Sequence, residues 1–479
     1  MKILVCLCLI FGNANLYAKS INLDEALLKK LVSNNPPGVQ QIRAMSEVNS
    51  LNHKMIYDKM GLSFNAQGAY INKDEQPLHP YDTIVTPVKN LKAGFIKPTE
   101  FGMQLSAHAY TEQLSSPFMK EQTTSGLLFG LSIDLYKDFL GSSTRASLRS
   151  TKQLEEMAKI ESTIGIKTYT LNLRKLYWAL ISNNEKIILS KMLLKNSETQ
   201  ATNAQKRLKD SVADKGEVAK FESQVAYRKA NIIYLEYLKE QYIKSLKELL
   251  PELSEDEIVL SSYNLDKSVN EVVSCTQLIA SKNNPPDEYT LLDEVINLLN
   301  ESYENQKIVT SKYSAIDVGL VSNVKTVGKS NSFSESYENH SNNKRANLEM
   351  ALNVTIPLSS RKSETRSTKE ALEKLQHSSR YDDLTGKIKT YHKQINQQIG
   401  LLQMVFQNQK INSEKLEISL KTTKTKYHQA RIDVYNLIND QDAYLQSQLA
   451  EIDTKLAVVT TLLDYLTVFT ELPCEFNRI

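Results

Sequence analysis

The sequence predicts a mixed, mainly α-helical fold that is built twice from the same parts: long helical hairpins and short groups of β-strands. The tetrapeptide Asn-Asn-Pro-Pro starting at Asn34 recurs starting at Asn283. Each copy is followed by strand-like segments, and then by a long stretch without proline, 118–250 in the first half and 358–472 in the second. A repeat of this length favours one architecture made of two similar halves over several unrelated domains.

The N-terminus has the features of a secretory signal peptide. A basic start at Lys2 precedes an apolar run from Ile3 to Phe11, and small and polar residues lead to Ala18. The run is too short to cross a membrane as a helix, so we predict a signal peptide over 1–18 and not a buried N-terminal element. The rest of the sequence has no apolar stretch of about 18 residues, so we expect no membrane-spanning helix there.

Composition and motifs argue against nucleic-acid binding, metal binding and catalysis. The net charge is +3, 24% of the residues are charged, and no basic block suggests a nucleic-acid partner. The seven histidines are scattered, and none of them forms a His-Glu-x-x-His pair. The sequence has neither a glycine-rich phosphate loop nor a nucleophile elbow. We therefore expect no catalytic site, no metal and no cofactor, and a secreted enzyme with an unfamiliar site is a further alternative.

Strand-like alternation marks one group of segments in each half, within 62–138 and within 313–358. Apolar residues there alternate with small or polar ones, which puts one face in apolar surroundings and the other in water. Half-buried strands of a soluble sheet and transmembrane strands both fit this pattern, and the signal peptide and polar alternate face suit the second. The alternating segments are 62–70, 127–135, 316–320 and 348–358.

The number of strands requires more than one chain if the sheet lies in a membrane. Four strands cannot close a barrel, and an open edge cannot lie in lipid, so the chain must oligomerise, and three chains supply twelve strands. The halves also differ in length. Gly68 and Ile133 are 65 positions apart, whereas Gly319 and Ile356 are 37 apart. We predict an added hairpin or long loop over 84–111, and whether it joins the barrel is left open.

The proline-free stretches carry the periodicity of long packed helices. Apolar residues from Leu445 to Leu466 step alternately by four and three, which is a heptad seam. Similar spacing from Val218 to Leu249 is interrupted by charged residues such as Arg228.

One break near 211–214 and another near 430–433 divide these stretches. We therefore predict helical hairpins over 143–250 and 360–470, with helices about 100 Å long. The breaks align when Arg207 is paired with Lys426. A periplasmic or surface coiled-coil structural protein is the alternative, and it explains the heptads but not the strands.

The order of these parts resembles TolC-type outer-membrane efflux proteins. Three local patterns support the resemblance: Val-Thr-Ile-Pro-Leu at 354–358, Leu-Tyr-Trp-Ala-Leu at 176–180 and Lys-Tyr-His-Gln-Ala at 426–430. The resemblance implies a trimeric α/β channel-tunnel, with a twelve-stranded barrel in the outer membrane and a helical tunnel in the periplasm. It also implies an equatorial region made by helices in 19–61, by 251–312 and by the tail 471–479.

The resemblance further implies a role and partners. The chain would be a passive exit duct of a tripartite efflux or type I secretion system, gated at its periplasmic helical tips. Its partners would be two further copies, a periplasmic adaptor protein, an inner-membrane RND or ABC transporter, and outer-membrane lipid.

Gate and adaptor positions are carried over from the family by alignment of the two breaks. The gating acid falls on Glu217, the gating tyrosine on Tyr427, and the acidic ring on Asn436 and Asn439, with Asp440 adjacent. The gating arginine falls on Ile432, beside Arg431, so the charge pattern departs from that of the family. A solvated helix turn is the alternative for each of these positions. The adaptor-contact turns comprise Ser211, Val212, Ala213, Ala430 and Ile432.

Two cysteines remain after removal of the signal peptide, Cys275 and Cys474. Each follows one helical hairpin, and the repeat places both near the equatorial region, in an oxidising compartment. A disulfide between them is a hypothesis, and two separate buried thiols are the alternative.

Overall fold

The computed structural model describes residues 20–72, 86–115, 122–261, 263–281, 291–342 and 346–468, so the predicted signal peptide lies outside it. The chain divides into two compact units. One comprises Met1–Arg43, Ser162–Leu292 and Gly386–Ile479, and the other comprises Ala44–Glu161 and Asp293–Thr385. No helix in the described ranges is long and apolar enough to cross a membrane.

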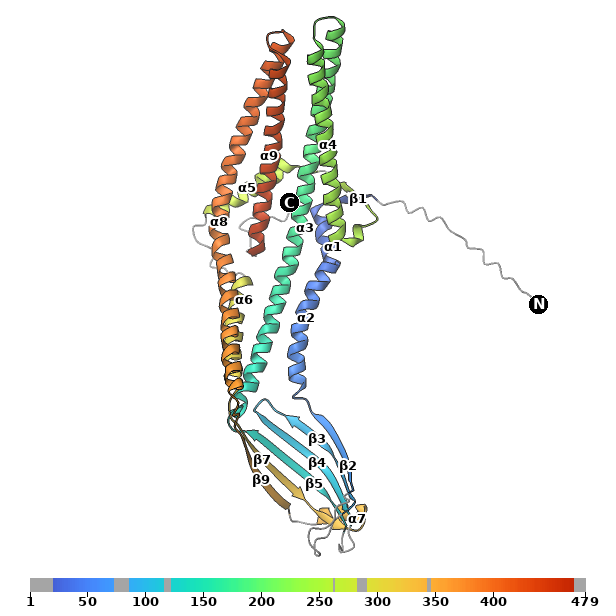
Figure 1. Cartoon of the computed structure of the whole chain (residues 1–479), viewed down its shortest axis with the longest axis vertical. Coiled ribbons are helices and arrows are strands. Elements are labelled where there is room, and N and C mark those ends of the chain that lie inside the picture. The colour runs from blue at the N-terminus through green and yellow to red at the C-terminus, as the bar shows by residue number, and fades with distance from the viewer. Residues whose placement is uncertain are drawn as a thin grey trace, which may run out of the picture. The chain divides into compact units, whose positions relative to one another are not determined.

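The second unit contains one antiparallel sheet, whose strands lie side by side in Figure 1. The strand order is β2-β3-β4-β5-β7-β9, and a short strand, β8, pairs with the end of β5. The strands are β2 (Ser63–Ile71), β3 (Val88–Pro98), β4 (Met103–Leu114), β5 (Thr123–Asp134), β7 (Asp317–Thr326), β8 (Gly328–Ser330) and β9 (Ala346–Thr355).

This sheet corrects the prediction of four strands per chain. The segment that lengthens the first half forms the hairpin β3–β4, and this hairpin is inserted into the sheet between β2 and β5. Gly94 fits the backbone of β4 closely, because a Cβ there would lie 2.1 Å from the carbonyl oxygen of Ala107. The inserted hairpin is thus an integral part of the sheet and not a surface loop.

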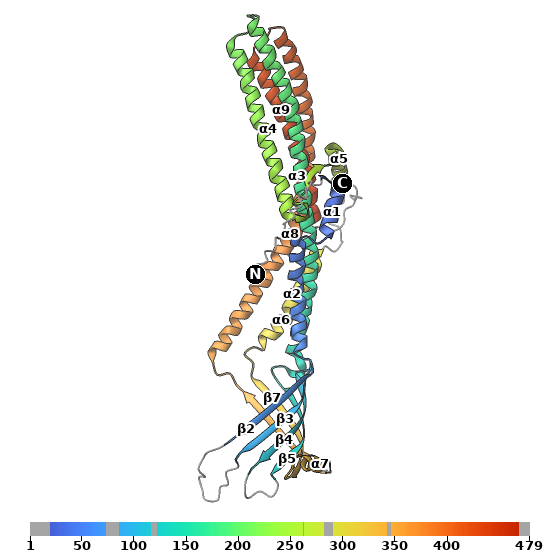
Figure 2. The ribbon, with the colours of Figure 1, turned by 90° about the vertical axis from the view of Figure 1, so that its right-hand side faces the viewer.

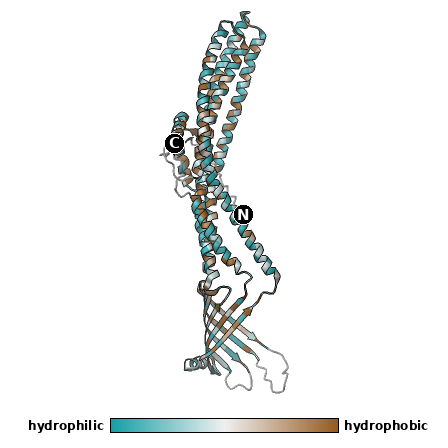
Figure 3. Ribbon diagram, turned by 90° about the vertical axis from the view of Figure 1, so that its left-hand side faces the viewer, coloured by the Kyte–Doolittle hydropathy of each residue, from teal (hydrophilic) through white to brown (hydrophobic). Residues whose placement is uncertain are grey.

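The sheet has one apolar face and one polar face. Directly opposed residues of an antiparallel pair lie on the same face, and Phe64 of β2 is opposite Phe95 of β3. The row continues along one apolar face through Ala107, Phe129, Val324 and Leu348. The opposite face carries Gln67, Lys92, Tyr110, Asn323, Lys325 and Glu349. Figure 3 shows the resulting alternation of hydrophobic and hydrophilic residues along the strands.

A short helix that the sequence did not predict, α7 (Phe333–Asn342), follows β8. The hydroxyl of its buried Ser336 lies 2.7 Å from that of Ser125 in β5. Gly328 allows this close packing, because a Cβ there would lie 2.0 Å from the carbonyl oxygen of Ser336.

Helices complete each unit. The first half contributes α1 (Glu25–Ser33), α2 (Pro37–Asp58), η1 (Phe139–Gly141), α3 (Ser142–Lys209) and α4 (Lys215–Leu249). The second half contributes η2 (Pro251–Leu253), α5 (Leu265–Ser281), α6 (Leu291–Ser311), α8 (Ser360–His428) and α9 (Val434–Val468). In Figure 2, α3 runs beside α4 and α8 beside α9, so the predicted fold class of repeated helical hairpins with strands is confirmed.

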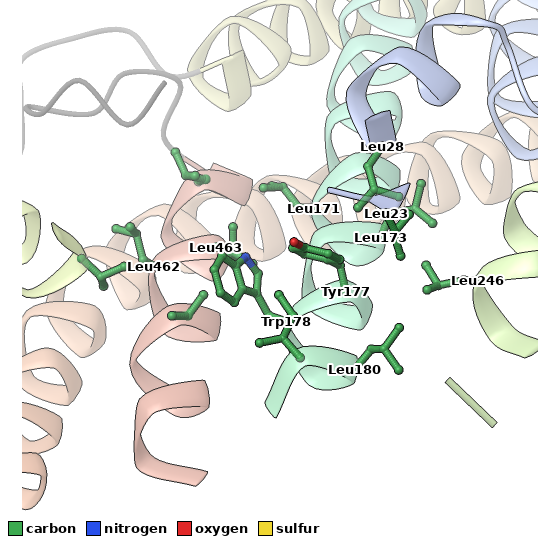
Figure 4. Close-up of a cluster of buried hydrophobic side chains, with 14 of the residues drawn as sticks. Leu23, Leu28, Leu171, Leu173, Tyr177, Trp178, Leu180, Leu246, Leu462 and Leu463 are labelled. Atoms are coloured by element: carbon green, nitrogen blue, oxygen red, sulfur yellow. The ribbon is translucent and has the colours of Figure 1, made fainter. Parts of the chain in front are cut away.

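A hydrophobic core in the first unit holds the base of the hairpins to the chain's N-terminal elements. Strand β1 (Ser20–Leu23) pairs in parallel with β6 (Glu257–Leu260). Figure 4 shows Leu23 and Leu28 beside side chains of α3 such as Leu173. Burial of a leucine side chain of this kind stabilises a fold by about 1.5–3 kcal/mol.

A buried ion pair fixes α1 against α3 within this core. The Glu25 carboxylate accepts hydrogen bonds from Arg174 Nε at 3.0 Å, Arg174 Nη2 at 2.9 Å and Trp178 Nε1 at 2.7 Å. The carboxylate and guanidinium side chains are each 8% exposed. Because both charges are paired and hydrogen-bonded, loss of either would leave a buried, uncompensated charge.

Candidate gate at the helical hairpin turns

The two hairpins turn with the same backbone conformation. Ser211 in the first turn has φ of 56°, and Ala430, which is 219 positions later, has φ of 54°. Residues with a side chain rarely adopt positive φ, so the shared conformation is a specific structural feature. It supports the alignment of Arg207 with Lys426, which is also separated by 219 positions.

An aspartate starts the returning helix in each hairpin. Asp214 Oδ1 accepts the backbone N–H of Glu217 at 2.7 Å, and Asp433 Oδ1 accepts the backbone N–H of Asn436 at 3.0 Å. Aspartate is a favoured N-cap because its carboxylate satisfies an otherwise unpaired helical N–H. The caps place Glu217 and Asn436 at equivalent positions, so the two turns have the same shape but different charge.

Three side chains join the first turn to the second. Arg207 Nη1 donates to Glu217 Oε1 at 2.9 Å and to the Tyr427 hydroxyl at 2.7 Å. The Tyr427 hydroxyl also donates to Glu217 Oε1. We call these three residues the turn triad. Since Arg207 and Glu217 belong to the first hairpin and Tyr427 to the second, the triad links the hairpins by charge-assisted hydrogen bonds.

Apolar packing supports the turn triad. The rings of Phe221 and Tyr427 meet edge to face, with centroids 6.0 Å apart and planes at 74°. The Arg207 guanidinium lies 5.2 Å from the centroid of the tyrosine ring, which is a cation–π contact. The buried cluster around them comprises Ala201, Ala204, Val218, Phe221, Tyr427, Val434 and Leu437.

The surroundings of Tyr427 keep its hydroxyl protonated. Burial, and then the hydrogen bond and charge of Glu217, raise the pKa of Tyr427 above its ordinary value of 10.0, whereas Arg207 opposes this shift. A protonated hydroxyl can donate to the Glu217 carboxylate and accept from the Arg207 guanidinium at the same time. The direction of the pKa shift therefore agrees with the hydrogen bonds of the triad.

A second polar contact joins the hairpins further along α4 and α9. Asp442 Oδ1 accepts from Gln224 Nε2 at 3.2 Å and from Arg228 Nη2 at 3.3 Å. The Arg228 side chain is only 4% exposed, whereas that of Asp442 is 43% exposed. Within the described residues, Arg228 Nε has no hydrogen-bond partner. Arg228 is thus a buried charge with incomplete compensation, a costly arrangement for a purely structural position.

The structure brings together some of the predicted gate residues and separates others. Glu217 and Tyr427 are in direct contact, and their role in a gate stays a prediction. Asp440 instead binds within its own hairpin, where it accepts from Ser419 at 3.1 Å and from Thr423 at 2.5 Å. The side chains of Arg431, Asn436 and Asn439 are exposed. The guanidinium that bridges the turns is therefore that of Arg207.

The predicted adaptor-contact residues are mostly accessible. Ser211, Val212 and Ala430 are exposed, and the Val212 side chain is a bare apolar group at 66% exposure. Ala213 is half-buried, and Ile432 packs against the apolar cluster under the triad. These turns thus offer a small surface for a partner, and their role as an adaptor contact stays a prediction.

Four residues of these contacts were not among the predicted site residues: Arg207, Gln224, Arg228 and Asp442. A signal was present for two of them. Arg228 interrupts an apolar heptad seam, and Arg207 is the residue aligned with Lys426 at the first break. A charged residue on a packed seam needs a partner when it is buried. The sequence therefore predicts that Arg228 has a partner, but it does not identify that partner.

The part of the chain that the structure describes contains no candidate metal site, and the hypothesised disulfide lies outside it. Its His, Cys, Asp and Glu side chains form no group of three or more that could hold a metal ion. Cys474 lies outside the described residues, as does the side chain of Cys275. The disulfide therefore stays a prediction.

Comparisons with known proteins identify the fold. No protein-family model and no curated protein matches the sequence. Solved structures match over nearly the whole chain. The outer membrane protein VceC of Vibrio cholerae is 12% identical, with a TM-score of 0.65 over 93% of this chain and 97% of its own.

Two other solved structures agree. CusC, whose structures concern transmembrane channel formation, is 10% identical, with a TM-score of 0.65 over 96% of this chain and 94% of its own. The CmeC outer membrane channel of Campylobacter jejuni is 12% identical, with a TM-score of 0.60 over 92% and 84%. The resemblance drawn from the sequence is therefore confirmed at the level of the fold, which is that of the TolC-type outer-membrane channels.

Proposed function

We propose that the protein is a passive exit duct in the outer membrane, part of a tripartite efflux or type I secretion system. Three copies would form a barrel in the membrane and a helical tunnel in the periplasm. The duct carries out no reaction, and its transport energy comes from an inner-membrane RND or ABC transporter coupled through a periplasmic adaptor. The fold supports this assignment.

The two-faced sheet is the observation that carries the proposal. Large apolar side chains stand exposed on one face, including Phe64 at 64%, Phe95 at 51% and Leu348 at 63% exposure. A soluble protein rarely leaves so continuous an apolar face bare. Lipid on this face and water on the polar face satisfy both sides, as in outer-membrane barrels. A coiled-coil structural protein has no use for such a sheet.

The turn triad gives the duct its gate. Hydrogen bonds between Arg207, Glu217 and Tyr427 hold the two hairpin turns together. Each bond to a charged group is worth about 1.5–3 kcal/mol, so a few bonds per copy suffice to hold a closed state. We propose that an adaptor bound at the exposed turn residues, such as Val212, separates the hairpins and opens the passage.

The test is to isolate the protein from outer membranes and measure its assembly and conductance. We expect heat-resistant trimers in detergent, low conductance in planar bilayers, and a rise in conductance when the triad is removed by Glu217→Gln with Tyr427→Phe. A monodisperse monomer that is stable without detergent would contradict the proposal. Unchanged conductance in the double variant would contradict the gate but not the duct.

A further inference from the structure

The two outer strands of the sheet lack partners along their outer edges. Strand β2 pairs only with β3, and β9 pairs only with β7, within the described residues. Every residue of β9 is exposed, as are eight of the nine residues of β2. Unpaired backbone groups of this kind are not tolerated in the hydrocarbon core of a membrane. Each edge therefore needs a further strand.

The strand directions fit a second copy of the same chain at these edges. All five pairings from β2 to β9 are antiparallel. Because six is an even number, β2 and β9 run in opposite directions. The β9 of one copy therefore meets the β2 of the next as an antiparallel pair, and a rotation that repeats this contact closes a ring.

The side chains on the two edges also match. With Thr355 placed opposite Ser63, the apolar Phe64 lies opposite the apolar Val354. The polar Asn65 then lies opposite the polar Asn353. A shift by one residue would place apolar side chains against polar ones along the whole edge. The faces of the two edges thus allow this register and exclude the two registers that are shifted from it by one residue.

The stagger of the sheet that follows from this register gives a further check. A row of paired residues that starts at Ser63 in β2 passes through Ile96, Ser106, Gly130 and Asn323 and ends at Glu349 in β9. Glu349 is six residues from Thr355, the end of β9. A stagger of about six residues over six strands gives a tilt of about 35°, which lies in the range of closed barrels.

We propose that β3 and β4 are wall strands and that three copies close an eighteen-stranded barrel through β2–β9 contacts. This inference rests on the proposed trimeric duct. It differs from the twelve strands expected from four strands per chain. Barrel diameter grows roughly linearly with strand number, so a barrel of eighteen strands is about half as wide again as one of twelve. Its polar inner face then lines a broad aqueous passage.

Engineered disulfides between polar-face residues test the strand order in the assembled protein. Asn65→Cys with Asn353→Cys probes the contact between copies. Gln67→Cys with Lys92→Cys probes β2–β3, and a third pair, His108→Cys with Leu128→Cys, probes β4–β5. Opposed strand residues lie about 4.5–5.5 Å apart at Cα, which suits a disulfide. The matched control is Phe64→Cys with Asn353→Cys, whose side chains point to opposite faces.

After mild oxidation, we expect the first pair to shift most of the protein from monomer to covalent trimer on a non-reducing gel. The second and third pairs should form bonds within one chain, identified by mass spectrometry of non-reduced peptides. The control pair should give no shift.

Two results would overturn the inference while leaving the duct intact. One is a native trimer without the β2–β3 or β4–β5 bond, because the hairpin would then lie outside the wall. The other is a native trimer in which Asn65→Cys bonds with no cysteine at 351, 353 or 355. A protein that is monomeric before oxidation would instead refute the proposed function itself.

Discussion

The two hairpin turns have nearly the same backbone but different chemistry. Both contain one residue with φ near 55°, Ser211 in the first turn and Ala430 in the second. Both begin the returning helix with a capping aspartate, Asp214 or Asp433. The repeat has therefore kept the backbone conformation of the turn and its capping aspartate.

The side chains that interact across the turns are not repeated. The buried tyrosine at 427 corresponds to Leu208 in the first turn, and the acid at 217 corresponds to Asn436 in the second. The second turn thus supplies the ring and hydroxyl, and the first supplies both charges. Because of this asymmetry, the two repeated hairpins of one chain present complementary surfaces to each other and not identical ones.

The largest effect is expected from removing the shared cation with Arg207→Met. The substitution deletes the donor to both Glu217 and Tyr427 and leaves the carboxylate, whose side chain is 16% exposed, with one partner fewer. We expect the contact between the hairpins to weaken by about 2–3 kcal/mol and single-channel conductance to rise severalfold. Planar-bilayer recordings measure this change.

The second turn offers a matched control for this variant. Lys426 occupies the position equivalent to Arg207 and is exposed, so Lys426→Met should leave conductance unchanged. Equal effects of the two substitutions would mean that general charge at the turns, and not the triad, holds the hairpins together.

A smaller effect is expected from Tyr427→Phe, which keeps the ring against Phe221 but removes the hydroxyl. Arg207 and Glu217 remain paired within the first hairpin, so only the bonds between hairpins are lost. We expect a cost of about 1–2 kcal/mol and a moderate rise in conductance. The exposed Tyr435 provides the control, since Tyr435→Phe should change neither conductance nor melting temperature.

The fold was predictable where a pattern repeats over many residues. The heptad seam from Leu445 to Leu466 and the alternation over 348–358 indicate α9 and β9 without any knowledge of tertiary contacts. The hairpin β3–β4 was only partly predictable. Its alternation is visible in the sequence, but insertion between β2 and β5 depends on pairing between distant segments, which local periodicity does not encode. Helix α7 is short and polar, and no such pattern marks it.

The site was predictable to the extent that the family alignment identified Glu217 and Tyr427. Arg207 was missed because the alignment sought an arginine near Ile432, in the other hairpin. A guanidinium reaches its partners from several backbone positions, so its place in the sequence is less constrained than its place in space. Arg228 shows the same difficulty, because its partner Asp442 lies 214 residues away.

Removal of each capping aspartate should separate the stability of the hairpins, to which both caps contribute, from conductance, which we expect to depend on the first cap only. Asp214→Ala and Asp433→Ala each remove one cap and should destabilise the hairpin by about 1 kcal/mol, measured by thermal unfolding. Only Asp214 holds the backbone of a triad residue, Glu217. We therefore expect a rise in conductance for Asp214→Ala alone, and equal conductance changes would show that turn rigidity, and not the triad, controls conductance.

The smallest effect concerns pH. Because burial and Glu217 raise the pKa of Tyr427 above its ordinary value of 10.0, the folded state binds this proton more tightly than the unfolded state. The hydroxyl's contribution to stability is therefore complete below about pH 10 and is lost as the pH rises through the folded pKa. The difference in melting temperature between the wild-type protein and Tyr427→Phe should be constant from about pH 7 to about pH 9 and shrink only at higher pH. A difference that instead grows as the pH rises from about 7 to about 9 would show that Tyr427 loses its proton more readily in the folded protein than in the unfolded chain, and that the triad does not keep it protonated.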